Sequence, residues 1–373
     1  MKTTLVKFSL AAAALLSTLN PQLSTVFAQG SLTPPGAPAP TMKSLDQIEP
    51  RTPISSAPFV ISEGGSYYLT TNVTVSSGDA ITIAANNVTL DLKGFTIAST
   101  LPDAVSDTAI LLSGGVTNIA IYNGHVSSGV TNTAAGVFGG GGFGYGINYS
   151  GTNAQNVRVK DVSVAGVLYS GISLGVDDST VVESCAINEA GSYGIVADSV
   201  SDSTAQNCGF VGIAAQVTQN CKGSAINGGL AFWVVTANNC YGYASGSGYG
   251  LVAANAYNCY GYSGGSGGMG VSASYQAWNC YGYTFGQGYG VNTLIAQGCY
   301  GESGANGFGV YARIATGCYG KSTTAGGIGL SAGTASNCAG EESSGGIAIQ
   351  ATIANGCITY SGTASITYKY NMP

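Results

Sequence analysis

The chain has 373 residues, 58 of them glycine, and its 17 acidic and 11 basic side chains give a formal charge of −6. This charge argues against nucleic acid or an anionic membrane as a partner. Charged residues make up only 8% of the chain, which excludes a largely helical protein, and the many Gly, Ser, Thr, Val and Tyr residues predict β-structure with tight turns.

Residues 1–28 have the three parts of a secretory signal peptide. Lys2 and Lys7 give a positive start, an apolar stretch follows from Phe8 to Leu16, and Val26 to Ala28 fits a cleavage site. The apolar stretch is too short to span a bilayer as a permanent helix, and no later stretch has the length. The sequence therefore predicts a bacterial protein without a membrane span, exported to the periplasm, the cell surface or the medium.

Residues 29–58 are rich in proline, because every proline except Pro102 and Pro373 lies between Pro21 and Pro58. This composition predicts an extended linker. Met42, Leu45 and Ile48 recur at helical spacing, so the segment has a second interpretation as an N-terminal cap on the domain that follows.

From Phe59 to residue 373 the chain consists of short β-branched runs divided by Gly, Asn, Asp and Ser. Val88, Leu90 and Leu92 alternate with polar residues, as in strands with one buried face. Later in the chain, over residues 205–360, Cys, Tyr and Gly recur together.

The cysteines mark a period of about 20 residues. From Cys221 onward they are 19 to 21 residues apart, whereas Cys208 precedes Cys221 by only 13, which we interpret as a shortened coil. Asn or Gly directly precedes nearly every cysteine, and both tolerate positive φ, so this position predicts a sharp left-handed corner. The cysteines are Cys185, Cys208, Cys221, Cys240, Cys259, Cys280, Cys299, Cys318, Cys338 and Cys357.

Such a period predicts an all-β, single-domain solenoid in which each repeat makes one coil. Strands of successive coils would pair in parallel about 4.8 Å apart, so that equivalent side chains form ladders along the axis. About 15 coils would fit between residues 60 and 360 at this period.

The segments "NVTLDLKGFTI" (87–97) and "NVRVKDVSV" (156–164) resemble the right-handed parallel β-helix repeats of the pectin-lyase-like superfamily, in particular its secreted bacterial members. The resemblance covers most of residues 59–360. It implies the fold, but this fold carries lyases, hydrolases, adhesins and proteins without activity, so it does not fix the function.

If the cysteines point inward, the residues one and three positions later point outward. The tyrosines at these positions would form two exposed columns, which could stack on sugar rings or on a second copy of the rod. Two alternatives stay open: stacking that only stabilises the sheet, and an inverted strand with tyrosine inside. The columns are Tyr241, Tyr260, Tyr281, Tyr300 and Tyr319, and Tyr243, Tyr262 and Tyr283.

The cysteines lack the spacing and the histidine partners of metal or redox sites. Export would permit disulfides, but side chains projecting in parallel are at the wide edge of disulfide geometry. We therefore predict a buried ladder of free thiols.

The resemblance also implies candidate catalytic residues. Lyases of this superfamily bind calcium through acidic side chains and use Arg or Lys as base, so Asp161, Asp178, Asp198 and Asp202 would be the calcium ligands and Arg158 or Lys160 the base. Its hydrolases use clustered aspartates, which Asp177 and Asp178 match, but their downstream His-Gly and Arg-x-Lys are missing and the only histidine is His125. Aspartates at turns also have a local structural role, and we favour that interpretation.

The sequence thus predicts an exported β-helix rod without catalysis and without a required cofactor. It would be structural or adhesive, with polysaccharide or a second copy as its partner. The alternative is a polysaccharide lyase or glycoside hydrolase with a divergent site, for which calcium would be the cofactor.

Overall fold

A computed structural model describes residues 51–134, 136–151, 154–176 and 179–372. The chain divides at Pro50 into two units, and the predicted signal peptide and most of the predicted linker lie outside the described residues. The first strand, β1, lies before Phe59 within the predicted 29–58 segment and pairs in parallel with β3.

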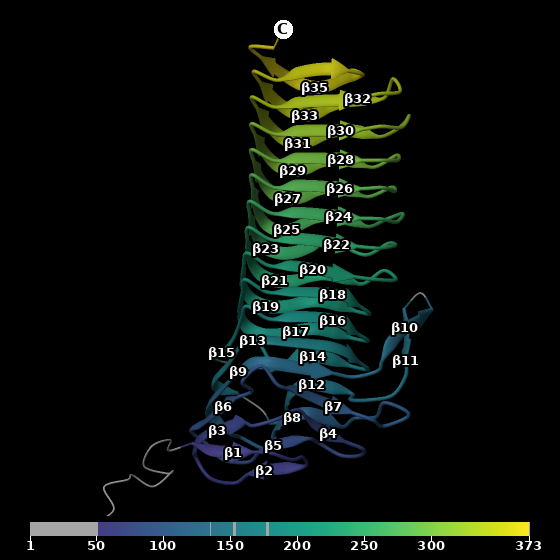
Figure 1. Ribbon diagram of the computed structural model, residues 1–373. Helices are drawn as coiled ribbons and strands as arrows, with labels where there is room; N and C mark the ends of the chain where they lie inside the picture. The colour runs from purple at the N-terminus through teal and green to yellow at the C-terminus, as the bar shows by residue number, and fades with distance from the viewer. Residues whose placement is uncertain (1–50, 135, 152–153, 177–178, 373) are drawn as a thin grey trace, which may run out of the picture. The chain divides into compact units, whose positions relative to one another are not determined.

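The unit from Arg51 onward is all-β over its described residues, with about 17 turns of about 19 residues (Figure 1). Thirty-three strands form one sheet wound into a solenoid, which confirms the predicted fold class. The exceptions are β10 and β11, which pair in antiparallel fashion as a separate arm.

The first half of the unit contains β1 (Thr52–Ile54), β2 (Phe59–Ile61), β3 (Gly65–Leu69), β4 (Val73–Val75), β5 (Ile81–Ile83), β6 (Val88–Asp91), β7 (Thr96–Ser99), β8 (Thr108–Leu112), β9 (Thr117–Ser127), β10 (Thr131–Ala134), β11 (Val137–Gly139), β12 (Tyr145–Tyr149), β13 (Gln155–Val167), β14 (Ser170–Ser173), β15 (Thr180–Glu183), β16 (Ala186–Ala190), β17 (Tyr193–Ser201) and β18 (Thr204–Cys208).

The second half contains β19 (Val211–Gln219), β20 (Lys222–Ala225), β21 (Leu230–Asn238), β22 (Tyr241–Ala244), β23 (Leu251–Tyr257), β24 (Tyr260–Ser263), β25 (Met269–Trp278), β26 (Tyr281–Thr284), β27 (Tyr289–Gln297), β28 (Tyr300–Ser303), β29 (Phe308–Thr316), β30 (Tyr319–Ser322), β31 (Ile328–Ser336), β32 (Ala339–Glu342), β33 (Ile347–Asn355), β34 (Ile358–Ser361) and β35 (Thr363–Tyr370).

Each later coil has the same plan: a left-handed corner, a buried cysteine, a short strand, a glycine-rich turn and a long strand. The corner is confirmed, since Asn239 and Asn258 have φ of 54° and 52°, and Gly298 has 61°. Asn side chains also connect the corners of neighbouring coils, as where Asn239 Nδ2 donates to Asn220 Oδ1 at 2.8 Å. An Asn corner therefore supplies both the conformation and a hydrogen bond to the coil below.

The long strands bend in the middle. In β29 the alternation of buried and exposed residues breaks where Arg313 and Ile314 are exposed in succession. Because a straight strand alternates strictly, two exposed neighbours mark a change of direction. Each long strand therefore contributes to two faces of the solenoid.

The interior becomes thinner along the axis. Most of the largest fully buried side chains, such as Ile81 and Leu90, belong to the early coils. In the later coils the inward side chains are smaller, mostly Ala, Cys and Val, with glycine between them. At Gly282 an added Cβ would lie 1.8 Å from the carbonyl oxygen of Gly290, so the short and long strands of that coil almost touch.

One prediction about the cysteines is wrong. Thr204 pairs with Lys222, so Ser203, and not Cys208, lies below Cys221. Cys208 is at the far end of β18, opposite Ala190 and Ala225. The coil is therefore not shortened, because the short spacing arises from two cysteines in different columns.

Candidate functional site

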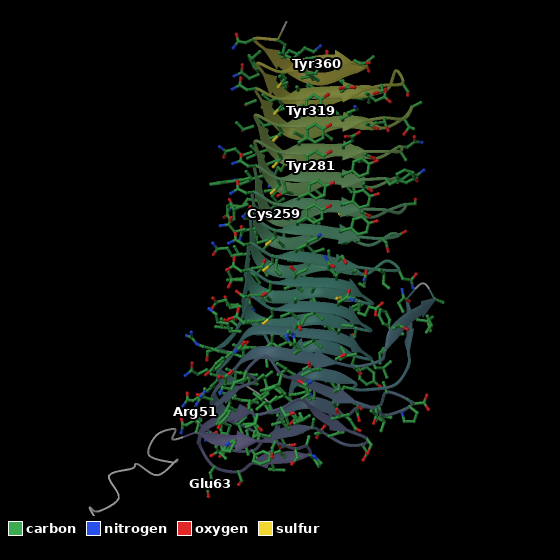
Figure 2. All side chains as sticks on the ribbon, viewed as in Figure 1. Arg51, Glu63, Cys259, Tyr281, Tyr319 and Tyr360 are labelled. Atoms are coloured by element: carbon green, nitrogen blue, oxygen red, sulfur yellow. The ribbon has the colours of Figure 1, made fainter. Side chains whose placement is uncertain are left out.

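The short strands β22, β24, β26, β28 and β30 present two columns of tyrosine, which we call the tyrosine ladder (Figure 2). They pair in register, so that Tyr241, Tyr260 and Tyr281 lie directly above one another. The rings point out of the solenoid, as the sequence predicted: Tyr241 and Tyr243 are 41% and 40% exposed, and the others are half-buried. The inverted arrangement with tyrosine inside is excluded.

The rings of the ladder stack on one another nearly in parallel. In the first column the centroids of Tyr241 and Tyr260 are 4.7 Å apart with planes 2° apart, and those of Tyr300 and Tyr319 are 5.1 Å apart at 18°. In the second column the spacings are 4.8 Å and 5.3 Å. Each spacing matches the distance between neighbouring strands, so the register of the sheet sets the stack.

This stacking leaves ring edges and hydroxyls, rather than ring faces, at the surface. The ends of the first column are also covered: Lys222 Nζ lies 5.7 Å from the ring centroid of Tyr241, and Tyr360 packs against Tyr319 at 5.9 Å. A ligand lying along the ladder would therefore meet a row of phenol hydroxyls. Burial, followed by the charges of neighbouring phenols, raises the pKa of Tyr260 to about 12, so its hydroxyl keeps its proton at neutral pH.

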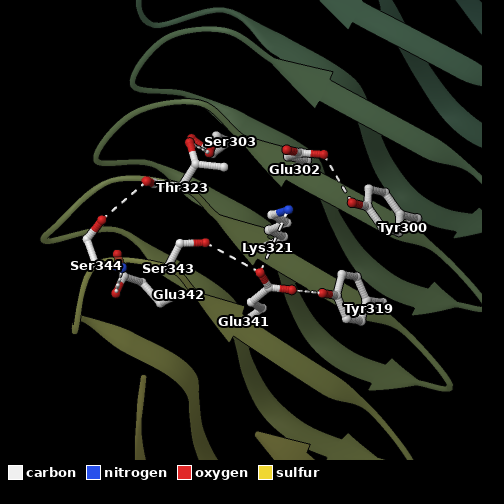
Figure 3. A network of polar contacts seen from close by, with 10 residues as sticks. All are labelled: Tyr300, Glu302, Ser303, Tyr319, Lys321, Thr323, Glu341, Glu342, Ser343 and Ser344. Atoms are coloured by element: carbon white, nitrogen blue, oxygen red, sulfur yellow. Dashed lines mark hydrogen bonds and ion pairs between the residues drawn. The ribbon is translucent and has the colours of Figure 1, made fainter. Parts of the chain in front are cut away.

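Charged residues continue the second column above Tyr283, where Glu302, Lys321 and Glu341 take its place (Figure 3). Tyr300 donates to Glu302 Oε2 at 3.0 Å, and Tyr319 donates to Glu341. Lys321 Nζ is 3.7 Å from Glu341 Oε1. The hydrogen bond from Tyr319 is the main cause that lowers the pKa of Glu341.

Behind the ladder lies a column of cysteines. All ten cysteines are buried and free, and eight of them, from Cys221 to Cys357, follow the corners coil by coil. This confirms the predicted thiol ladder, apart from Cys208. Burial raises the pKa of Cys185 and of Cys208 to about 12, so these thiols are held neutral and are poor nucleophiles.

The lyase candidates lie around the corner of β13. Asp161 has the left-handed corner conformation and is exposed, and Asp202 has the same conformation two coils further on, with Ser184 between them. Asp202 Oδ1 accepts the hydrogen bond of Asn220 Nδ2 at 2.9 Å, as a corner residue does. Asp198 lies on β17, half-buried.

The candidate bases Lys160 and Arg158 and the histidine His125 are all exposed. Lys160 Nζ is 2.6 Å from Glu183 Oε1, and this hydrogen bond raises the pKa of Lys160, which is the opposite of what a base requires. Arg158 is exposed on the same strand. His125 is also exposed, and its Nδ1 is 2.6 Å from Ser163 Oγ. Asp177 and Asp178 lie outside the described residues.

Metal binding finds no geometric support in the described part of the chain, where no three His, Cys, Asp or Glu side chains converge on one point. In the same residues no helix is long and apolar enough to cross a membrane.

The sequence did not predict two hollows on the long strands. The first, of about 600 Å³, is lined by Tyr145, Tyr169, Trp233 and Gln216, and Trp233 is 54% exposed. The second is more polar, has a volume of about 770 Å³ and lies on later coils. Both follow one column of paired residues: Asn148, Ser173, Val196, Ala214, Trp233, Val252, Ser272, Asn292, Tyr311, Ser331 and Gln350.

Comparison with known protein families, with curated proteins and with solved structures finds no match to this chain. The fold is therefore assigned from the strand pairing itself. The resemblance to the pectin-lyase-like superfamily remains a prediction.

Proposed function

We propose that the protein is an exported, non-catalytic rod that holds an extended polysaccharide along its tyrosine ladder. The observation that carries the proposal is the row of eight outward tyrosines in two adjacent columns, spaced at one ring per coil. Soluble proteins rarely expose an aromatic surface of this length without a use for it.

The stacked geometry specifies how such a polymer would bind. Because the ring faces cover one another, binding would come from hydrogen bonds of the phenol hydroxyls and from contact with ring edges. A chain rich in hydroxyls and running parallel to the axis would meet one tyrosine of the first column per coil. In the three coils of Tyr243, Tyr262 and Tyr283 it would also meet a tyrosine of the second column. The net negative charge of the protein favours a neutral polysaccharide over an acidic one.

The test compares two triple variants on an oligosaccharide array. Tyr260/Tyr281/Tyr300→Phe keeps the ring stack but removes three hydroxyls, whereas Tyr260/Tyr281/Tyr300→Ala removes the rings as well. Both should lose binding, and the Phe variant should keep a Tm within a few degrees of the wild type. Tyr275→Ala is the matched control, because Tyr275 is 62% exposed on β25, away from the ladder.

A Phe variant that binds as tightly as the wild type would remove the hydroxyl mechanism. A wild-type protein that binds no glycan on the array would leave the ladder a purely structural stack and overturn the proposal.

The second candidate is a polysaccharide lyase or glycoside hydrolase. It is favoured by the hollow of about 600 Å³ at Trp233, because substrate sites are concave and lined mostly by apolar side chains. An activity screen on acidic polysaccharides with and without calcium distinguishes it from the rod. Calcium-dependent unsaturated product that disappears in Asp178→Asn would establish the enzyme, whereas sugar binding lost only in the tyrosine variants supports the rod.

A further inference from the structure

The indole of Trp233 is not covered by a ring of the neighbouring coil, unlike the tyrosines of the ladder. In its outward column Ala214 precedes it on β19 and Val252 follows it on β23. Ala214 lines the hollow at Trp233 and Val252 does not, so the hollow lies on the Ala214 side of the indole. A methyl group is too small to cover an indole, and in the described part of the chain no aromatic ring packs against Trp233, which is 54% exposed. Its aromatic surface is therefore available to a ligand in the hollow.

The hollow arises because small side chains lie between large aromatic ones. It extends over β12, β14, β17, β19 and β21, which follow one another along the solenoid (Figure 1). In the outward column, Ser173, Val196 and Ala214 take the three places before Trp233. The other aromatic side chains that line the hollow are Tyr145, Tyr169 and Tyr193.

The polar groups that line the hollow are uncharged. Asn148 and Gln216 provide amides, and Ser170, Ser173 and Ser192 provide hydroxyls. No Asp, Glu, Lys, Arg or His is among the described lining residues. Amides and hydroxyls can both donate and accept hydrogen bonds, as a ligand rich in hydroxyls requires. A charged ligand would find no counter-charge in this lining, so the hollow favours a neutral one.

The size and the mixed lining of the hollow match one class of small ligand. Its volume of about 600 Å³ is typical of small-molecule sites, in which apolar walls carry a few polar groups. A pyranose ring has a face of C–H groups, which can pack on an aromatic ring, and a rim of hydroxyls. A purely apolar ligand would contact the aromatic walls but would remove water from the amides and hydroxyls without replacing its hydrogen bonds.

We propose that the hollow at Trp233 binds a neutral sugar unit, whose pyranose ring packs on the indole. Its hydroxyls would bond to the amides of Asn148 and Gln216. This site is on the long strands, whereas the tyrosine ladder is on the short strands β22 to β30. The inference therefore does not depend on polysaccharide binding by the ladder.

The fluorescence of Trp233 tests the site directly. The chain has two tryptophans, and the other, Trp278, packs edge-on against Tyr257 with ring centroids 5.6 Å apart. Trp278→Phe therefore leaves Trp233 as the only tryptophan reporter. Titration of this variant with cellotriose, maltotriose and chitotriose should shift the emission to shorter wavelength with at least one of these sugars, because the sugar displaces water from the indole. Trigalacturonate, the acidic comparison, should cause no shift.

Three further changes in the Trp278→Phe background locate the site. Ala214→Leu enlarges the side chain on the hollow side of the indole and should raise the half-saturating sugar concentration at least about tenfold. Ser173→Leu narrows the hollow from another coil and should have the same effect, which covers the case that Ala214→Leu does not fold. Val252→Leu is the matched control, because it enlarges the same column on the opposite side of Trp233 and should keep the response.

The outcomes separate this site from the ladder. A sugar held only by the tyrosine ladder would leave the emission of Trp233 unchanged, so either proposal can fail without the other. No shift with any of the three neutral sugars, or a shift with trigalacturonate alone, would overturn the site. An unchanged response in folded Ala214→Leu and Ser173→Leu would overturn it as well.

Discussion

Gly282→Ala tests how closely the two walls of a late coil approach each other. The added methyl group would lie 1.8 Å from Gly290 O, 2.5 Å from Gly290 C and 2.9 Å from Val291 Cγ2. Two of these three atoms belong to the backbone, so no rotamer change relieves the contact. The strands β26 and β27 would have to separate, and Gly261 and Gly301 in the neighbouring coils occupy equally narrow positions.

The expected loss is at the upper end of the range for overpacked cores, about 3 kcal/mol. At about 2 °C per kcal/mol for a large domain, Tm should fall by about 6 °C. Gly115→Ala is the control, because Gly115 is exposed and its Cβ would meet nothing within 4 Å. If both variants melt within about 2 °C of the wild type, the interior is wider than described and the assignment of inward and outward faces fails.

Three further predictions concern the corners and the thiols. Asn258→Ala should destabilise the protein by about 1–2 kcal/mol in denaturant unfolding, because alanine is strained in the left-handed conformation. Asn258→Gly should destabilise it less, and equal losses of stability in the two variants would contradict the role of φ. The thiols should react with a thiol reagent only after unfolding. Burial raises the pKa of Cys185 and Cys208 to about 12, whereas these thiols ionise near pH 9 in the unfolded chain. The contribution of the two thiols to stability should therefore be complete below pH 9 and decrease between pH 9 and pH 12. A Tm that stays constant from about pH 9 to about pH 11 would refute this.

The sequence was sufficient to predict the coil and the direction of its side chains. The corner could be predicted because only a few residue types tolerate positive φ, so Asn and Gly at one position are a direct signal of backbone conformation. The outward ladder followed from the alternation of a strand, once a cysteine was placed inside.

The register could not be predicted where a different residue took the inward position. Ser203 takes the place of cysteine in its coil, while Cys208 lies in another column. A strand register assigned from the cysteines alone is therefore wrong at this coil. The corner at Asp202, with φ of 50°, was the better marker.

Two other features had weaker signals. Trp233 belongs to the continuous apolar run "LAFWVV", whose periodicity cannot tell an exposed from a buried residue. Glu342 is fully buried, but it follows another glutamate, and charged residues are expected outside, although strict alternation requires one of the pair to point inward. The buried hydroxyls that pair in register in the same column, those of Ser263, Thr284, Ser303 and Ser322, could have shown which one.

Residues one period apart lie directly above one another across the tyrosine ladder. Spin labels at Lys222→Cys and Ala339→Cys measure this stacking, since these positions flank the first column and the native thiols are buried. Six coil steps separate them, which at about 4.8 Å per step predicts a distance near 29 Å despite their wide separation in sequence. A distance distribution centred well beyond about 40 Å, or one without a defined maximum, would show that the coils are not stacked in this register.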